Sequence, residues 1–176
     1  MDAARLLSLL RPHLADSGAH WALAGGFALA AWGSTRTTLD LDLLVEEAGR
    51  GSLLPALGRE GFATLFDSEG FTNLLHADRD LGRLDLVWVE GETARRIFAA
   101  AVEKLGPDGL PLLVPAPEHL VAMKVRAIRN SPTRVFRDGE DLRVLLRLPG
   151  IDENEVRATF ERAGLLDLHA RLAAAP

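Results

Sequence analysis

The chain has 176 residues, of which 48% are hydrophobic and 26% are charged, and its net charge is −5. These values are typical of a globular protein that is long enough for one sizeable core or two small lobes. The lack of cysteine excludes disulfides, thiolate zinc sites and a cysteine nucleophile. The negative charge argues against a nucleic-acid footprint over the whole surface, although a local basic patch remains open at Arg126, Arg129, Arg134 and Arg137.

The sequence has neither a signal-peptide pattern at its N-terminus nor an apolar run long enough to cross a membrane. We therefore expect a cytoplasmic protein without a membrane partner.

The first half of the chain alternates between helical and strand patterns. Apolar residues recur at helical spacing over 2–16, and two further helices are predicted at 26–33 and 51–60. The helix at 51–60 is expected to have Ser52 as its cap and Pro55 in its first turn. Strands are predicted at 20–24, 39–45, 62–66, 72–76 and 83–89.

The second half of the chain is mostly helical. Its predicted helices are 92–104, 117–130, 138–148, 153–163 and 166–174. Several prolines and glycines interrupt the chain between residues 107 and 117. We expect an α/β fold in one compact unit of two lobes, with a mixed sheet in residues 1–106 and a mainly helical lobe in 107–176.

Two aspartates lie inside an apolar segment. Asp40 and Asp42 are two residues apart, so in a strand their side chains point to the same face, roughly 7 Å apart. Neighbouring carboxylates beside a core repel each other and are poorly solvated, and a divalent cation such as Mg²⁺ relieves both effects. Acids also alternate on exposed strand faces, so this pair alone does not establish a metal site.

A glycine pair precedes these aspartates. Gly25 and Gly26 follow the predicted strand 20–24 and open the predicted helix 26–33. Such a turn offers free backbone N–H groups and the positive end of the helix dipole to a phosphate. Glycines are also common wherever a strand turns tightly into a helix. Together, the glycines and the aspartates predict a site for a metal-bound nucleoside triphosphate.

The order of these motifs resembles that of the nucleotidyltransferase superfamily typified by DNA polymerase beta. The signature of that family is an apolar residue, Gly-Gly or Gly-Ser, a helix, and then Asp-apolar-Asp-apolar. Here it takes the form Ala24-Gly25-Gly26 and Asp40-Leu41-Asp42-Leu43. Arg36-Thr37-Thr38 stands before the aspartates, as in small bacterial members of the family. Gly26 departs from the pattern, because many relatives have a serine there.

The resemblance extends to the second half of the chain and covers about residues 20–148. Segments 117–124 and 137–142 are similar to the C-terminal part of minimal nucleotidyltransferases. Those proteins include toxins of abortive-infection type toxin–antitoxin systems and antibiotic nucleotidyltransferases.

The resemblance implies a third metal carboxylate from a later strand, and Asp85 in the predicted strand 83–89 supplies it. Asp40, Asp42 and Asp85 would then be catalytic and would hold two Mg²⁺ ions, with Mn²⁺ as an alternative. Asp85 would also act as base toward the acceptor. The other explanation for Asp85, which stands close to Arg83 in the sequence, is that it forms one half of a cross-sheet ion pair. Arg36 either caps the sheet edge or binds phosphate oxygens.

Lys124 lies on the apolar side of the predicted helix 117–130, because it is four residues from both Leu120 and Ile128. An unpaired ammonium is unfavourable there. Either its long side chain reaches to water, or it binds the triphosphate, as the resemblance implies.

Two acids begin the predicted helix 138–148. Asp138 is either the helix cap or the functional acid of this segment. Asp141 shares a face with Leu145 and is expected to point inward, where it accepts a hydrogen bond from Lys124 or orients the acceptor. The predicted nucleotide-binding residues are thus Gly25, Gly26, Arg36, Lys124 and Asp141. None of the five histidines has metal-ligand spacing to another.

These residues predict a metal-dependent nucleotidyltransferase that transfers NMP from an NTP, such as ATP, to an acceptor hydroxyl. As the toxin of a toxin–antitoxin system, the protein would modify tRNA or another protein and would have an antitoxin partner. As an antibiotic nucleotidyltransferase, it would modify an aminoglycoside or lincosamide-like small molecule. A catalytically silent nucleotide-binding module is the third alternative, and the presence of all three carboxylates argues against it.

Overall fold

The computed structural model describes residues 1–35 and 37–174. The chain divides into two compact units, one formed by Met1–Ala31 and Thr35–Pro115 and the other by Trp32–Ser34 and Ala116–Pro176. The first unit is α/β and the second is helical, which confirms the predicted fold class. Among the described residues, every helix is too short or too polar to cross a lipid bilayer.

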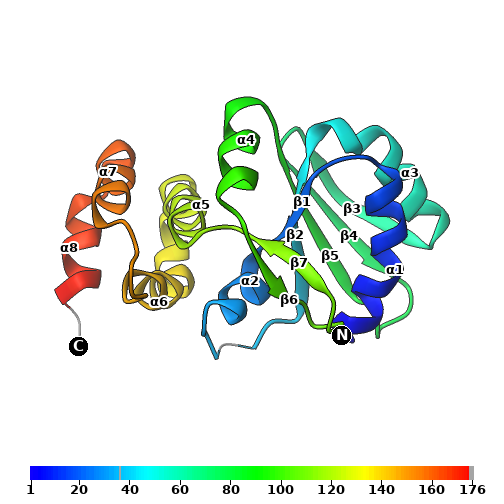
Figure 1. The fold of residues 1–176 in the computed structure, drawn as a ribbon, viewed down its shortest axis with the longest axis horizontal. Helices are drawn as coiled ribbons and strands as arrows, with labels where there is room; N and C mark the ends of the chain where they lie inside the picture. The colour runs from blue at the N-terminus through cyan, green and yellow to red at the C-terminus, as the bar shows by residue number, and fades with distance from the viewer. Residues whose placement is uncertain (36, 175–176) are drawn as a thin grey trace. The chain divides into compact units, whose positions relative to one another are not determined.

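A mixed five-stranded sheet forms the centre of the first unit (Figure 1). Its strand order is β1-β2-β5-β4-β3, and β2 pairs with β5 in parallel while the other neighbours are antiparallel. The strands are β1 (Trp21–Leu23), β2 (Asp40–Glu46), β3 (Phe62–Ser68), β4 (Phe71–His76) and β5 (Arg83–Val89). All five predicted strands are therefore confirmed.

Four α-helices accompany this sheet: α1 (Ala3–Asp16), α2 (Gly25–Ala31), α3 (Arg50–Arg59) and α4 (Gly91–Ala100). Asp2 caps α1 by accepting a hydrogen bond from the backbone N–H of Arg5 at 3.0 Å. The prediction for α3 was wrong in its start. A 3-10 turn, η1 (Glu47–Gly49), leads directly into Arg50, so Gly49 occupies the cap position instead of Ser52, and Pro55 lies inside the helix.

The prediction of one helix over 92–104 was wrong at its C-terminal end. After α4 the chain forms β6 (Val102–Leu105), which pairs with β7 (Pro111–Val114) in an antiparallel hairpin. Gly109 has a φ of +75°, and its N–H donates to the carbonyl of Gly106 at 2.9 Å. This tight turn lets residues 102–105 pair with a partner strand, which their helix-compatible sequence does not reveal.

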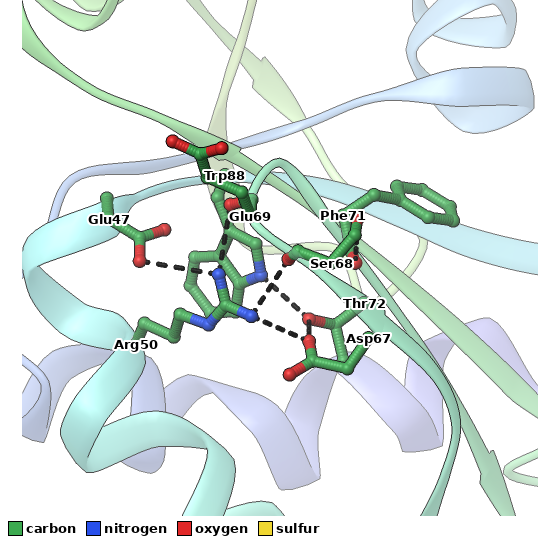
Figure 2. Close-up of polar contacts among 8 residues, drawn as sticks. All are labelled: Glu47, Arg50, Asp67, Ser68, Glu69, Phe71, Thr72 and Trp88. Carbon is green, nitrogen blue, oxygen red and sulfur yellow. Dashed lines mark hydrogen bonds and ion pairs between the residues drawn. The ribbon is translucent and has the colours of Figure 1, made fainter.

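Arg50 fastens the β3–β4 turn to the start of α3 (Figure 2). Its guanidinium donates to Asp67 Oδ1 at 2.7 Å and lies 5.3 Å from the ring centroid of Trp88. Thr72 Oγ1 links Asp67 to Trp88, because it donates a hydrogen bond to Asp67 and accepts one from Trp88 Nε1 at 2.8 Å. The Thr72 hydroxyl, followed by Arg50, holds the pKa of the Asp67 carboxyl below its usual value. These bonds fix the hairpin that supplies β4 to the sheet.

The described part of the second unit, up to residue 174, contains four α-helices: α5 (Pro117–Asn130), α6 (Val135–Leu146), α7 (Glu153–Ala163) and α8 (Leu166–Ala174). A 3-10 turn, η2 (Pro132–Arg134), joins α5 to α6. Asp152 caps α7, and Gly164 ends it in the left-handed region with a φ of +71°. Because α6 begins at Val135, the predicted helix start at residue 138 was wrong, and of the two alternatives for Asp138 the helix cap is excluded. Asp138 lies buried in the first turn.

Candidate active site

Asp42 and Asp85 are direct neighbours in the sheet. Strands β2 and β5 run in parallel, and their register places Asp42 opposite Asp85 and Asp40 opposite Arg83. Alternation along β2 places Asp40 on the same face as Asp42, and both are half-buried, whereas Leu41 between them is buried. The sheet therefore gathers the three predicted carboxylates on two adjacent strands, in the first unit.

Asp40 and Asp85 each accept a hydrogen bond from a neighbouring polar side chain. Thr38 Oγ1 donates to Asp40 Oδ1 at 2.6 Å. Asn73 of β4, which is the register partner of Asp85 on the other side, donates from Nδ2 to Asp85 Oδ1 at 2.5 Å. Asp85 is 6% exposed, so this bond satisfies an acid that is otherwise poorly solvated.

Arg83 brings a positive charge to the three aspartates. Its Nε donates to Asp85 Oδ1 at 2.9 Å, so Asp85 does form an ion pair, but within β5 and not across the sheet as the other explanation for Asp85 had it. The hydrogen bond to Asp85 raises the pKa of the Arg83 guanidinium, and the charges of Asp85, Asp40 and Asp42 add to the effect. The three carboxylates therefore lie close enough to one guanidinium for each to favour its charged form.

Gly25 and Gly26 are required by the packing of this site. Gly25 has a φ of +54°, and a Cβ there would lie 1.8 Å from Asp42 Oδ2. A Cβ on Gly26 would lie 2.6 Å from Thr38 Cβ. The backbone at the start of α2 therefore lies directly against Asp42 and against the threonine that binds Asp40. Arg36, the other predicted phosphate ligand of this region, lies outside the described residues.

The carboxylate group has the donor chemistry of a divalent-metal site. In residues 1–35 and 37–174, no three His, Asp or Glu side chains are gathered closely enough to enclose an ion as they stand. In the described hydrogen bonds of Asp40 and Asp85, the accepting oxygen is Oδ1 in each case. Oδ2 of each aspartate therefore remains as a ligand for a cation. Hard carboxylate oxygens are the ligands that Mg²⁺ and Mn²⁺ prefer, so the chemistry of these residues fits such an ion, although their side chains as they stand are not close enough to enclose one.

A second charged cluster lies in the helical unit. Lys124 Nζ donates to Asp138 Oδ1 at 2.9 Å and also to Asp141 Oδ2, the contact expected for Asp141. Arg134 Nε donates to the other oxygen of Asp138 at 2.8 Å. Asp138 and Asp141 are 0% and 1% exposed, and the Lys124 side chain is 13% exposed. The ammonium is therefore neutralised by two buried acids instead of reaching water.

The environment keeps Asp138 ionised. Burial is the largest influence and acts to raise the pKa of this carboxyl, but Lys124 and Arg134 together outweigh it and lower the pKa below its usual value. Asp138 is thus an anchor for two cations, and it holds Lys124 jointly with Asp141.

Sequence reasoning missed Asn73 and Arg134 as partners of the predicted residues. Asn73 is 7% exposed and precedes Leu74 and Leu75 in β4, so an amide inside a predicted strand was the available signal. Arg134 is four residues before Asp138, which is ion-pair spacing only once the 3-10 turn η2 is known to lead into α6.

Comparison with protein families identifies a relationship over nearly the whole chain. The model of the family described as "Nucleotidyl transferase AbiEii toxin, Type IV TA system" matches residues 8–174. A comparison with curated proteins finds no match.

Several solved structures share this fold. The solution structure of the antibiotic-resistance factor ANT(2'')-Ia has a TM-score of 0.67 at 18% identity, and the match covers 98% of this chain and 97% of that one. The lincomycin-bound lincosamide antibiotic adenylyltransferase LnuA has a TM-score of 0.55 at 13% identity, with 82% and 96% covered. TM1012, a putative nucleotidyltransferase from Thermotoga maritima, has a TM-score of 0.52 at 14% identity, with 76% and 89% covered. At these identities the likeness shows the fold alone.

Proposed function

The chain belongs to the AbiEii toxin family of nucleotidyl transferases, and from this premise we propose that it transfers NMP from a metal-bound NTP to an acceptor hydroxyl. The observation that carries the proposal is the register of β2 and β5, which sets Asp42 opposite Asp85 with Asp40 on the same strand face as Asp42. Three hard oxygen donors at adjacent strands are the arrangement that a magnesium–triphosphate complex needs.

In this proposal, Asp40 and Asp42 hold the divalent ion that carries the triphosphate, and Asp85 serves the acceptor side. Two divalent ions held there, Mg²⁺ or Mn²⁺, would stabilise the charge on the attacking and leaving oxygens. The acceptor oxygen forms a bond to the α-phosphorus, the bond from that phosphorus to the bridging oxygen breaks, and pyrophosphate leaves. Asp85 takes the proton of the acceptor hydroxyl, and Asn73 keeps its carboxylate oriented.

The remaining predicted residues are assigned to the nucleotide. Gly25, Gly26 and Arg36 are proposed to contact the phosphates, and the close approach of Gly25 to Asp42 supports this for the glycines. Lys124 is proposed as a triphosphate ligand, and its bond to Asp141 supports a role for that acid in orienting the ammonium.

For the biological role, we propose a toxin that modifies RNA or protein and has an antitoxin as its partner. The support is the description of the family as a Type IV toxin–antitoxin system. The alternative role is modification of an aminoglycoside or lincosamide-like antibiotic.

One experiment separates these roles. The purified protein is incubated with each α-³²P-labelled NTP, Mg²⁺ and a cell extract, and in parallel with aminoglycosides and lincosamides. Label in RNA or protein supports the toxin, and label in an antibiotic supports the alternative. The Asp42→Asn variant must lose the label in either case. Absence of label from every fraction with the wild type, despite NTP binding, would make the protein a silent nucleotide-binding module.

A further inference from the structure

A groove of about 390 Å³ lies between α5 and α7 in the helical unit. Arg126 and Arg129 of α5 line one side, and Arg162 of α7 lines the other. Asn130 adds an amide, and the other lining residues are small or apolar, except for the hydroxyl of Thr159. Among the described residues that line it, none is acidic and none is aromatic.

The arginines that line this groove make few hydrogen bonds or ion pairs within the described residues, unlike other arginines of the same unit. Within residues 1–35 and 37–174, the side chains of Arg126 and Arg129 make no hydrogen bond or ion pair, and both are exposed. Arg162 donates only to the Thr159 hydroxyl, at 3.1 Å. By contrast, Arg134 and Arg143 are paired with carboxylates. In a chain with a net charge of −5, such a gathering of like charges is unfavourable until an anion joins it.

This groove is separate from the Lys124 cluster. Residues of an α-helix are about 100° apart around the axis, so Arg126 lies about 200° from Lys124, on the opposite side of α5. Lys124 faces Asp138 and Asp141 on α6, whereas Arg126 and Arg129 face α7. The arginines therefore have no part in holding Lys124.

We propose that this groove binds the phosphodiester backbone of an RNA acceptor. A guanidinium presents a planar fork of donors that matches a phosphate, and Arg126 and Arg129 are one helical turn apart, with Arg162 across from them. Three such forks on two walls contact successive phosphates of one strand. The absence of aromatic lining residues means that bases are not stacked here, so recognition is of the backbone and independent of sequence.

The inference rests on the proposed function, because an RNA supplies both the phosphates for this groove and a ribose hydroxyl as acceptor. It selects RNA over protein as the substrate class. The chemistry also admits the phosphates of a free nucleotide, and the experiment below distinguishes the two sources.

The test measures RNA binding without turnover. In an Asp42→Asn background, fluorescence anisotropy follows the binding of labelled oligouridylate and of a tRNA mixture at several salt concentrations. The groove variant combines Arg126→Gln, Arg129→Gln and Arg162→Gln. Its matched control combines Arg59→Gln, Arg157→Gln and Arg171→Gln, which removes the same charge from exposed arginines outside the groove. ATP binding is measured on a second set of proteins, which carry the same arginine substitutions but keep Asp42.

We expect the groove variant to bind RNA about ten- to a hundredfold more weakly and to show a salt slope shallower by roughly 2, as loss of three single-strand phosphate contacts requires. The control should stay within about threefold of its parent, and ATP affinity should not change. An Arg→Lys version of the groove variant, which keeps the charge, should recover part of the affinity and guards against misfolding.

Three results would overturn the proposal: no RNA binding by the parent protein, equal weakening by the control, or a loss of ATP affinity in place of RNA affinity. None of these depends on nucleotidyl transfer, since the binding assay uses a protein without the Asp42 carboxylate. If transfer fails but the groove variant still loses RNA affinity, the groove assignment stands and the proposed reaction falls.

Discussion

Asp42 and Asp85 stand opposite each other on parallel strands, although α3 and the whole β3–β4 hairpin separate them along the chain. Two carboxylates at this spacing repel, and the structure offsets the repulsion with the guanidinium of Arg83 and the amide of Asn73. A cation bound between the two carboxylates would further reduce their repulsion. Replacing either carboxylate should therefore change metal and nucleotide binding or turnover in a way that can be measured.

Replacing Asp42 by Asn should remove metal-dependent nucleotide binding. The amide keeps the shape of the side chain beside Gly25 but loses the charge, so affinity for NTP in Mg²⁺ should fall about ten- to a hundredfold, or about 1.5–3 kcal/mol. Isothermal calorimetry with and without Mg²⁺ measures this. Asp16→Asn, an exposed acid at the end of α1, is the control and should leave the signal intact. A Mg²⁺-dependent signal that survives in Asp42→Asn would count decisively against this site.

Replacing Asp85 by Asn should abolish turnover and spare NTP binding. The amide oxygen still accepts the hydrogen bond from Asn73, so the local structure persists, but the side chain can no longer take a proton from the acceptor. Single-turnover transfer and equilibrium NTP affinity are measured on the same protein. Loss of both in equal measure would move Asp85 to the nucleotide side, and retained turnover would remove it from the mechanism.

The sequence predicted β2 and β5 because each is an apolar run in which charged residues alternate with apolar ones at its start, a pattern that indicates a strand. It did not predict which residue of β5 faces Asp42, because strand register depends on how α3 and the β3–β4 hairpin return the chain to the sheet. The partnership of Asn73 with Asp85 was hidden for the same reason, since it crosses an antiparallel pair.

Two element boundaries in the second half of the chain were predicted wrongly, the end of α4 and the start of α6. Residues 102–105 have no glycine or proline, so the helical pattern of α4 runs into them, and only pairing with β7 makes them a strand. In α6, η2 sets the helix start at Val135, so Asp138 turns inward as a buried anchor and not outward as a cap. In the first case the pairing with β7 overrode the local preference of the sequence, and in the second the 3-10 turn before α6 set the helix start.

Replacing Gly25 by Ala should damage the site more than the fold. An L-residue is strained at a φ of +54°, and the new methyl group would overlap the Asp42 carboxylate. We expect a loss of about 1–3 kcal/mol of unfolding free energy and at least a tenfold loss of NTP affinity. Gly58→Ala in α3 is the matched control, because a Cβ there meets nothing within 4 Å, and it should be neutral or slightly stabilising. Equal effects at both positions would refute the close-approach argument.

Replacing Lys124 by Ala should weaken binding of NTP far more than binding of NMP, because only contacts to the β- and γ-phosphates are lost. It also leaves Asp138 and Asp141 buried without their shared cation, at a cost of about 3–5 kcal/mol in unfolding free energy. Binding must therefore be measured at a temperature where the variant is folded. Lys124→Arg keeps the charge and should retain much of the stability. If NTP and NMP affinities fall together, Lys124 is a structural ion-pair residue with no phosphate contact.

Replacing Asp138 by Asn should change how stability depends on pH. Lys124 and Arg134 hold the pKa of this carboxyl below that of the unfolded chain, so its ionised form stabilises the folded state. That contribution is fully present above the unfolded-state pKa of about 3.9 and is lost as pH falls through the lower folded-state pKa. At neutral pH, Asp138→Asn should cost about 3 kcal/mol, because it leaves Lys124 and Arg134 with one fewer buried anion.

The wild-type and Asp138→Asn stability curves should therefore converge in acid. Urea unfolding at a series of pH values from neutral to about 3 measures the difference in unfolding free energy, which should be constant down to roughly pH 4 and shrink below it. Subtracting one curve from the other removes the acid sensitivity of other carboxylates with a lowered pKa, such as Asp67 and Asp78, which both proteins share. Asp16→Asn, at an exposed position of α1, is measured alongside as the control substitution. A difference that stays constant or widens in acid would mean that Asp138 is not the ionised anchor of this cluster.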